Sequence, residues 1–230
     1  MYYYDTYYFL LLAVVVISFI VQGMVNSRFE KYSKVATRTG MTGKEVAEKI
    51  LRDAGISDVS VKFAQGSGLS DHYDPMKRVL RLSERVINSN SVAAVSVAAH
   101  EASHALQHAE NYKPLVLRTA CVNSVNFGSR FSMLIIILGL FLSFTPLLYV
   151  GVALYSLVVF FALITLPVEF NASRRALSIL SDTGVVSADE LHGAKSVLSA
   201  AAMTYVVSAL SAVIQLLRLV ALANRAKDRD

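Results

Sequence analysis

Long stretches without a charged residue constrain this chain more than any other feature of its sequence. No Asp, Glu, Lys or Arg occurs between Asp5 and Arg28, and none occurs from Phe131 to Val168. A helix needs about 20 apolar residues to cross the hydrocarbon core of a bilayer. The first stretch therefore predicts one transmembrane helix. The second predicts two helices that form a hairpin, because backbone exposed to lipid must satisfy its hydrogen bonds within its own segment.

The composition agrees with a membrane protein. Apolar types make up 54% of the 230 residues and charged types only 17%, against roughly 25% in soluble domains. The single cysteine, Cys121, excludes an internal disulfide and a cysteine-based zinc cluster. We expect the N-terminal run to be retained as an anchor, because no Lys or Arg precedes it. A cleaved signal peptide, which is the alternative, would need that basic start.

Basic residues orient the chain. Fourteen of the 22 Lys and Arg residues lie from Arg28 to Arg118, and the positive-inside rule places this region in the cytoplasm. The hairpin then returns Glu169 to the cytoplasmic side. For the last apolar region, 197–223, three alternatives are open: a fourth span, a helix packed on the domain, or a helix in the interface. A span would carry the basic C-terminal residues outside, so we expect that it does not cross.

The hairpin and the cytoplasmic region contain recognisable local signals. Ser143, Thr145, Pro146 and Gly151 mark the expected turn of the hairpin. In the cytoplasmic region, a capping box at residues 42–45 predicts a helix. Residues 59–63 and 79–82 alternate like strands, and we expect them to pair antiparallel across a turn-rich loop, 66–74.

A long helix is expected from Ser91 to His108, and it carries the sequence HEASH. His100 and His104 are four residues apart, so they lie on one face of this helix and can reach one metal ion. Two imidazoles suit Zn²⁺ and leave positions for a third protein ligand and a water. Glu101 is placed to take a proton from that water. The alternative, two unligated histidines beside a glutamate in a buried helix, would be costly.

The third ligand must come from elsewhere in the chain. An extended motif would place a histidine at position 110, which is Glu110. His108 lies four residues beyond His104, but a helix rises about 6 Å over that distance. We therefore expect His108 to be an outer or surface group. Glu169, at the start of an expected polar helix after the hairpin, is the better candidate; the alternative is an interfacial glutamate paired with a neighbouring arginine.

Several segments give the chain a resemblance to a known family: HEASHALQH, LPVEFNASRRA, AKSVLSAAAMTYV and SDHYDPMKRVLRLS. With the N-terminal anchor, they are similar to the YugP-type neutral zinc metallopeptidases, bacterial membrane proteins related to the HtpX-like and CAAX-prenyl-protease-like gluzincins. The resemblance implies one zinc per chain on His100, His104 and Glu169, with Glu101 as general base and acid. HtpX-like relatives usually have an aspartate where this chain has Ser173. That outer carboxylate is absent, which leaves the orientation of the ligating histidines open.

We therefore predict an α+β, mostly helical chain in which a zincin-like metallopeptidase region with a small sheet is joined to several transmembrane helices. Its expected segments are a transmembrane anchor (1–27), a cytoplasmic zincin-like region (28–130), a transmembrane hairpin (131–168) and the third-ligand helix with a C-terminal apolar helix (169–230). The protein is expected in the cell membrane as a multi-pass chain. Its catalytic region is expected in the cytoplasm.

The predicted function is hydrolysis of peptide bonds by a zinc-activated water, with Glu101 as general base. The oxyanion that forms needs one more donor, and the candidates are His192, Tyr205, Arg174 and Arg175. Zincin architecture suggests that substrate aligns as an extra strand along 79–82. The alternative is a non-proteolytic membrane scaffold or regulatory partner with a zinc site, although a structural site would normally be closed by four protein ligands.

The expected partners are a protein or peptide substrate and the lipid bilayer. Membrane-protein partners or a homo-oligomer are further candidates. Nucleic acid is not expected, because the basic residues are spread along the chain without interleaved aromatic residues. A zinc transporter is not expected either, because the charge-free spans offer no intramembrane ligands.

Overall fold

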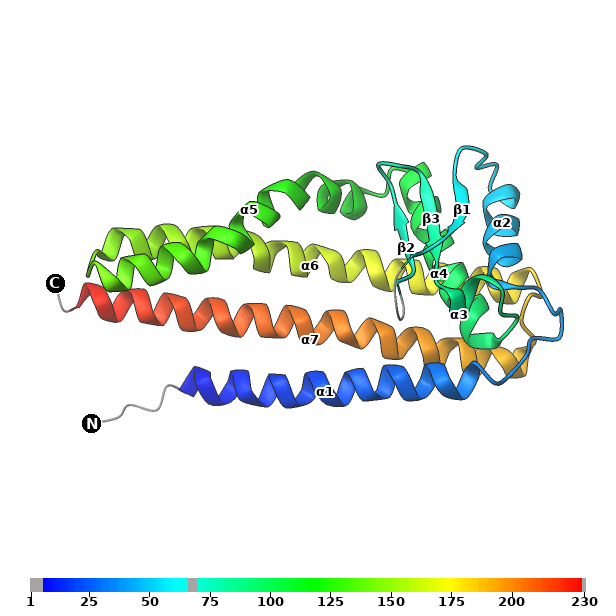
Figure 1. Cartoon of the computed structure of the whole chain (residues 1–230), viewed down its shortest axis with the longest axis horizontal. Coiled ribbons are helices and arrows are strands. Elements are labelled where there is room, and N and C mark those ends of the chain that lie inside the picture. The colour runs from blue at the N-terminus through cyan, green and yellow to red at the C-terminus, as the bar shows by residue number, and fades with distance from the viewer. Residues whose placement is uncertain (1–5, 66–69, 229–230) are drawn as a thin grey trace. The chain divides into compact units, whose positions relative to one another are not determined.

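The computed structural model describes residues 6–65 and 70–228, which are mostly helical with one small sheet (Figure 1). This confirms the expected mixture of helices with a minor sheet. In chain order, the elements are α1 (Thr6–Tyr32), α2 (Gly43–Asp53), β1 (Ser60–Phe63), β2 (His72–Asp74), β3 (Val79–Leu82), α3 (Glu84–Ile87), α4 (Val92–Ala109), α5 (Lys113–Phe141), α6 (Thr145–Asp182) and α7 (Ala188–Lys227).

The chain divides into two compact units. We call the first the apolar unit; it comprises Met1–Ile20, Val116–Pro167 and Thr204–Asp230. The second, the mixed unit, comprises Val21–Leu115 and Val168–Met203 and holds the sheet and the shorter helices. The long helices α1, α5, α6 and α7 each contribute residues to both units.

These four long helices are long and apolar enough to cross a membrane. Large apolar side chains in the apolar unit are exposed, among them Phe19 at 76% and Phe141 at 85%. Soluble proteins rarely leave so much apolar surface open to water, and a bilayer would cover it. The predicted N-terminal span and the predicted hairpin are both present as candidate spans, with α5 and α6 joined by residues 142–144.

Close approach of α5 and α6 depends on glycines. A Cβ added at Gly151 would lie 2.3 Å from Cγ1 of Ile136, and one added at Gly128 would lie 2.8 Å from the carbonyl oxygen of Leu154. Small residues at helix contacts allow such approach in membranes, where packing replaces the hydrophobic effect as the driving force. Gly151, which we expected in the turn, therefore lies inside α6 and packs against α5.

One expectation about the long helices differs from the structure, and a second is not tested by it. Glu169 does not begin a new helix, because α6 continues through Pro167 without a break. An interior proline removes one hydrogen bond and bends a helix, and here it does not end it. The region 197–223 belongs to α7, which satisfies the same criteria of length and apolarity as the other candidate spans. Our expectation that this region does not cross the membrane rested only on the basic residues at its C-terminal end, which a span would carry outside.

The sheet of the mixed unit has the strand order β1-β3-β2. β1 and β3 are parallel, with Ser60 opposite Val79, so the predicted antiparallel pairing of these segments is wrong. The reason is β2, which lies within the predicted loop and pairs antiparallel with β3. β2 joins β3 through a tight turn and occupies one edge of β3. β1 is therefore left with the other edge of β3, where it runs parallel to that strand. Residues 66–69 of the predicted loop lie outside the described residues.

Helix α4 is fixed at its start and along one face. The Ser91 side chain accepts a hydrogen bond from the backbone N–H of Ala94 and caps the helix. The first two turns are buried, and their alanines allow α2 to pack closely. α2 itself begins at the predicted capping box, in which Thr42 and Glu45 satisfy each other's backbone N–H groups. The middle of α4, which carries His100 and His104, is thereby held in place.

Gly43, the first residue of α2, provides a test of this packing. A Cβ at Gly43 would lie 2.4 Å from the carbonyl oxygen of Val86 in α3. We expect Gly43→Ala to destabilise the protein by about 1–3 kcal/mol because backbone must move, and to lower the Tm of thermal unfolding followed by circular dichroism in detergent. Gly23→Ala is the control, since nothing lies within 4 Å of that position. Equal melting of Gly43→Ala and wild type would contradict this packing.

Candidate metal centre

Two helices bring three potential metal ligands together. α4 contributes His100 and His104, and α6 contributes Glu169. Oε2 of Glu169 lies 3.2 Å from Nε2 of His100 and 3.6 Å from Nε2 of His104. One ligand atom from each residue falls within 4.8 Å of the others. Residues 65 positions apart thus converge on one point, as the sequence predicted for this trio.

The donor set fits a zinc ion. Ligand atoms about 2.0–2.1 Å from a tetrahedral ion are roughly 3.3 Å apart, close to the separations between Glu169 and the two imidazoles. Glu169 is only 2% exposed and His104 only 7%. Burial lowers the pKa of His104, but the hydrogen bond to Glu169 and the charges of Glu101 and Glu169 outweigh it and hold this pKa above the usual value. The arrangement therefore favours positive charge at this point.

The orientation of both imidazoles is set by neighbours that carry no charge. Nδ1 of His100 lies 3.2 Å from the hydroxyl oxygen of Ser173. Nδ1 of His104 lies 2.9 Å from Oε1 of Gln107. An Nδ1–H that donates to an oxygen leaves Nε2 without a proton and free to bind a metal. Ser173 and Gln107 thus take the place of the outer carboxylate that is absent at position 173.

Gln107 is itself anchored to α6. Its amide nitrogen donates to the backbone oxygen of Val168 at 2.9 Å and to Oδ1 of Asn171 at 2.8 Å. The same Asn171 oxygen accepts from Nε of Arg175, whose guanidinium is also paired with both carboxylate oxygens of Glu110. Position 110, which lacks the histidine of the extended motif, therefore supports the centre through an ion pair. Arg175 is engaged in this pair, which argues against it as an oxyanion donor.

Glu101 is held by the edge strand β2. Its Oε2 accepts a hydrogen bond from the backbone N–H of Tyr73 at 3.0 Å. Tyr73 is paired with Leu80 of β3, and its N–H points away from β3, as in a non-hydrogen-bonded antiparallel pair. Asp71 lies at the start of the same segment, where its carboxylate accepts bonds from the N–H and the hydroxyl of Ser83. Burial raises the pKa of Asp71, and the nearby charge of Glu101 adds to this rise.

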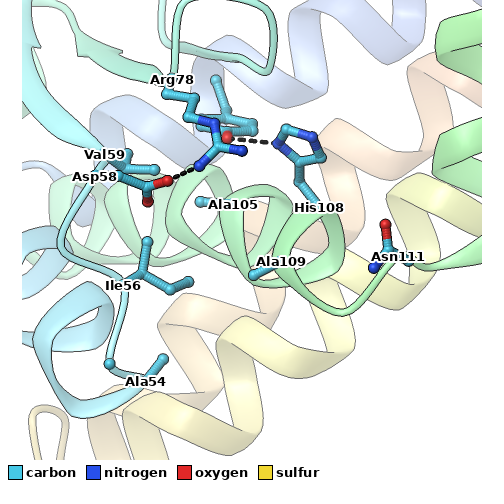
Figure 2. A pocket seen from close by; sticks show the side chains of 11 residues that line it. Ala54, Ile56, Asp58, Val59, Arg78, Ala105, His108, Ala109 and Asn111 are labelled. Carbon is cyan, nitrogen blue, oxygen red and sulfur yellow. Dashed lines mark hydrogen bonds and ion pairs between the residues drawn. The ribbon is translucent and has the colours of Figure 1, made fainter.

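A cavity of about 410 Å³ adjoins this part of the site (Figure 2). Tyr73 lines it and places its hydroxyl 2.8 Å from Nδ1 of His108. Arg78 and Asp58, which form an ion pair with each other, also line the cavity (Figure 2). Ala105 also lines the cavity, and it lies one helical turn beyond Glu101 on the same face of α4. His108 therefore belongs to this cavity rather than to the trio of ligands.

The other sequence candidates lie elsewhere. His192 is exposed on α7 and lines a different cavity, beside Arg28. Arg174 is exposed on α6, and Tyr205 belongs to the apolar unit. An oxyanion role for these residues stays a prediction. The expected docking strand is wrong, because β3 has a neighbour on both edges and cannot accept a further strand.

Four residues of the site were missed from the sequence: Asp71, Tyr73, Gln107 and Asn171. One signal was available for Gln107, which follows His104 by three residues and so shares its helix face. Tyr73 and Asp71 gave no comparable signal, because their roles depend on the pairing of a three-residue strand.

Comparison with known proteins agrees with this chemistry. A family model described as "putative neutral zinc metallopeptidase" matches residues 7–224. A protein of Bacillus subtilis with the name "Putative membrane protease YugP" is 48% identical over 214 residues, which cover 93% of this chain and 95% of that protein. No solved structure matches the chain significantly.

Gln107 provides a test of the centre that leaves every proposed ligand in place. We expect Gln107→Ala to weaken zinc binding about 10–100-fold, as loss of an outer partner of a ligating histidine usually does. Competition with a chromogenic chelator would measure this affinity. Gln65→Ala, at an exposed position, is the matched control. Zinc affinity that is unchanged in Gln107→Ala would show that Gln107 does not orient His104.

Proposed function

Because this chain belongs to the family of neutral zinc metallopeptidases, we propose that it is a membrane-embedded zinc endopeptidase of the gluzincin type with a zincin-like catalytic region. The observation that carries this proposal is the convergence of His100, His104 and Glu169 beside Glu101. A site with three protein ligands leaves a position for water or substrate, as catalytic zinc sites do, whereas structural sites are normally closed by four. This favours an enzyme over a scaffold.

His100, His104 and Glu169 would hold one zinc per chain. When bound, zinc supplies the Lewis acidity that lowers the pKa of a water and polarises a peptide carbonyl. Ser173 and Gln107 keep the two imidazoles in the tautomer that presents Nε2. Because Glu169 is almost fully buried, its charge is little screened and contributes strongly to holding a cation.

Glu101 is the proposed general base. The Tyr73 N–H fixes one of its oxygens, Oε2, whereas Oε1 makes no hydrogen bond with the described residues 6–65 and 70–228. Oε1 is therefore the atom that would accept the proton of the attacking water. The same carboxyl group would then pass this proton to the departing amine nitrogen. A hydrogen bond from the backbone fixes the carboxylate without adding a competing charge.

Substrate is proposed to lie along the outer edge of β2. This edge is unpaired within the described part of the sheet, and it carries Tyr73, whose backbone binds Glu101. The Tyr73 carbonyl points in the same direction as its N–H and would accept a hydrogen bond from the backbone of an extended peptide. A residue of that peptide could reach the cavity lined by His108 and Ala105.

The proposed location of catalysis is the cytoplasmic face of the cell membrane. The four candidate spans, together with the printed name of the Bacillus subtilis relative as a membrane protease, support a membrane protein. The cytoplasmic side is supported by the concentration of basic residues from Arg28 to Arg118. The proposed partners are a protein or peptide substrate and the surrounding lipid.

Variants at Glu101 and Glu169 would distinguish the loss of proton transfer from the loss of metal binding. We expect Glu101→Gln to keep one zinc per chain and to lose peptide cleavage by at least about 100-fold, the usual contribution of a general base. Glu169→Ala should lower zinc content because a ligand is lost. Metal analysis and cleavage of fluorogenic peptides by the detergent-purified full chain would measure both effects. Absence of zinc from wild type would refute the metal site, and full activity of Glu101→Gln would refute its role as base.

Variants at Tyr73 would test whether the backbone N–H that binds Glu101 contributes to catalysis. Tyr73→Pro and Tyr73→Ala both remove the phenol, but only the proline removes the N–H. Because this N–H points away from β3, the proline leaves the sheet ladder intact. We expect kcat to fall by about tenfold or more in Tyr73→Pro relative to Tyr73→Ala, with zinc content equal. Equal kcat values in the two variants would contradict the proposed role of this N–H.

A further inference from the structure

Two of the candidate spans have a charged residue at the end of a charge-free run of the same length. In α1 the run covers residues 6–27 and is followed by Arg28. In α7 it covers residues 196–217 and is preceded by Lys195. Each run of 22 residues is about 33 Å long as a helix, close to the ~30 Å of a hydrocarbon core. Arg28 and Lys195 are thus placed where an apolar segment would meet phospholipid headgroups.

These two cations line one cavity of about 280 Å³ in the mixed unit. Its lining residues are Arg28, His192, Lys195, Ser196 and Ser199. The four that α7 contributes are spaced i, i+3, i+4 and i+7, so they form one stripe along a single face of that helix. A single face of α7 therefore presents an imidazole, an ammonium group and two hydroxyls beside the Arg28 guanidinium.

A close approach of the helices places Arg28 beside this stripe. A Cβ added at Gly193 of α7 would lie 2.7 Å from ring atoms of Tyr32 in α1, so only glycine allows this contact. Arg28 precedes Tyr32 by four residues and lies on the same face of α1. The second half of α1 and the first half of α7 lie side by side in Figure 1.

The cavity offers hydrogen-bond donors and positive charge, and no acidic side chain lines it. Among the described residues, neither Arg28 nor Lys195 forms an ion pair, although several other basic side chains of the mixed unit do, such as Arg85 with Glu30 and Lys49 with Asp53. Arginine, lysine and serine hydroxyls together suit an anion with several oxygen atoms. Phosphate is the anion that membranes present at this depth.

We propose that this cavity binds the phosphate group of an anionic phospholipid. Guanidinium and ammonium would neutralise the phosphodiester charge, and the hydroxyls of Ser196 and Ser199 would donate to its oxygens. The acyl chains would follow the charge-free runs of α1 and α7. His192, which the sequence suggested for catalysis, is assigned to this lipid site. A soluble phosphate has the same chemistry, so the test compares both sources.

Native mass spectrometry of the detergent-purified full chain would measure binding of phosphatidylglycerol, phosphatidylcholine and inorganic phosphate. We expect phosphatidylglycerol to bind wild type more tightly than the other two. In the double variant Arg28→Gln/Lys195→Gln, its affinity should fall by about tenfold or more, since each basic residue near a membrane surface contributes to anionic lipid binding. The matched control is Arg52→Gln/Lys62→Gln, which removes two exposed cations from α2 and β1 and should bind as wild type does.

Two further variants keep the outcome interpretable if the double variant folds poorly. Ser199→Leu fills the cavity without removing charge and should also weaken binding, whereas Arg28→Lys/Lys195→Arg should restore it. Phosphatidylglycerol bound equally by wild type and the double variant would overturn the proposal. Phosphatidylcholine bound as tightly as phosphatidylglycerol would overturn it as well. A third outcome is that inorganic phosphate binds wild type as tightly as the lipid does and that this binding is lost in the double variant. That result would overturn the lipid assignment and show a soluble phosphate site instead.

Discussion

The burial of the Glu169 carboxylate against two imidazoles is the interaction on which the rest of the site depends. An isolated carboxylate at this depth would be strongly unfavourable, and it is stable only if positive charge accompanies it. Both imidazoles lie within 3.6 Å of its Oε2, and a divalent cation would meet the same need. Every other feature of the centre keeps these three groups in register: the cap of α4, its buried alanines and the network around Gln107.

That network shows how a metal centre can be oriented without an outer carboxylate. Gln107 has both an acceptor and a donor, so one side chain fixes the tautomer of His104 and ties α4 to the backbone of Val168. A carboxylate in its place could accept from His104 but could not donate to a carbonyl. A neutral partner also adds no further negative charge beside Glu169. The charge of Glu110 is kept farther out, where Arg175 pairs with it.

The sequence predicted what local patterns determine. Charge-free runs indicated the long helices, the capping box indicated α2, and the spacing of His100 and His104 placed two imidazoles on one face of α4. It failed where the outcome depends on pairing between segments. The three residues of β2 are too few to give a periodic signal, yet their pairing with β3 leaves β1 only the other edge of β3 and directs the Tyr73 N–H to Glu101. The link between Gln107 and Asn171 was missed because these two residues lie 64 positions apart in the sequence.

The shortness of β2 also constrains how a substrate can be bound. Tyr73 is the residue of this strand whose backbone demonstrably points outward, and its N–H already serves Glu101. A peptide on this edge would therefore gain few backbone hydrogen bonds, each with a net contribution of about 0.5–1.5 kcal/mol. Such an edge gives little affinity by itself. Confinement of enzyme and substrate to one membrane raises their effective concentration. The geometry thus fits the proposed peptidase best when its substrate is also held at the membrane.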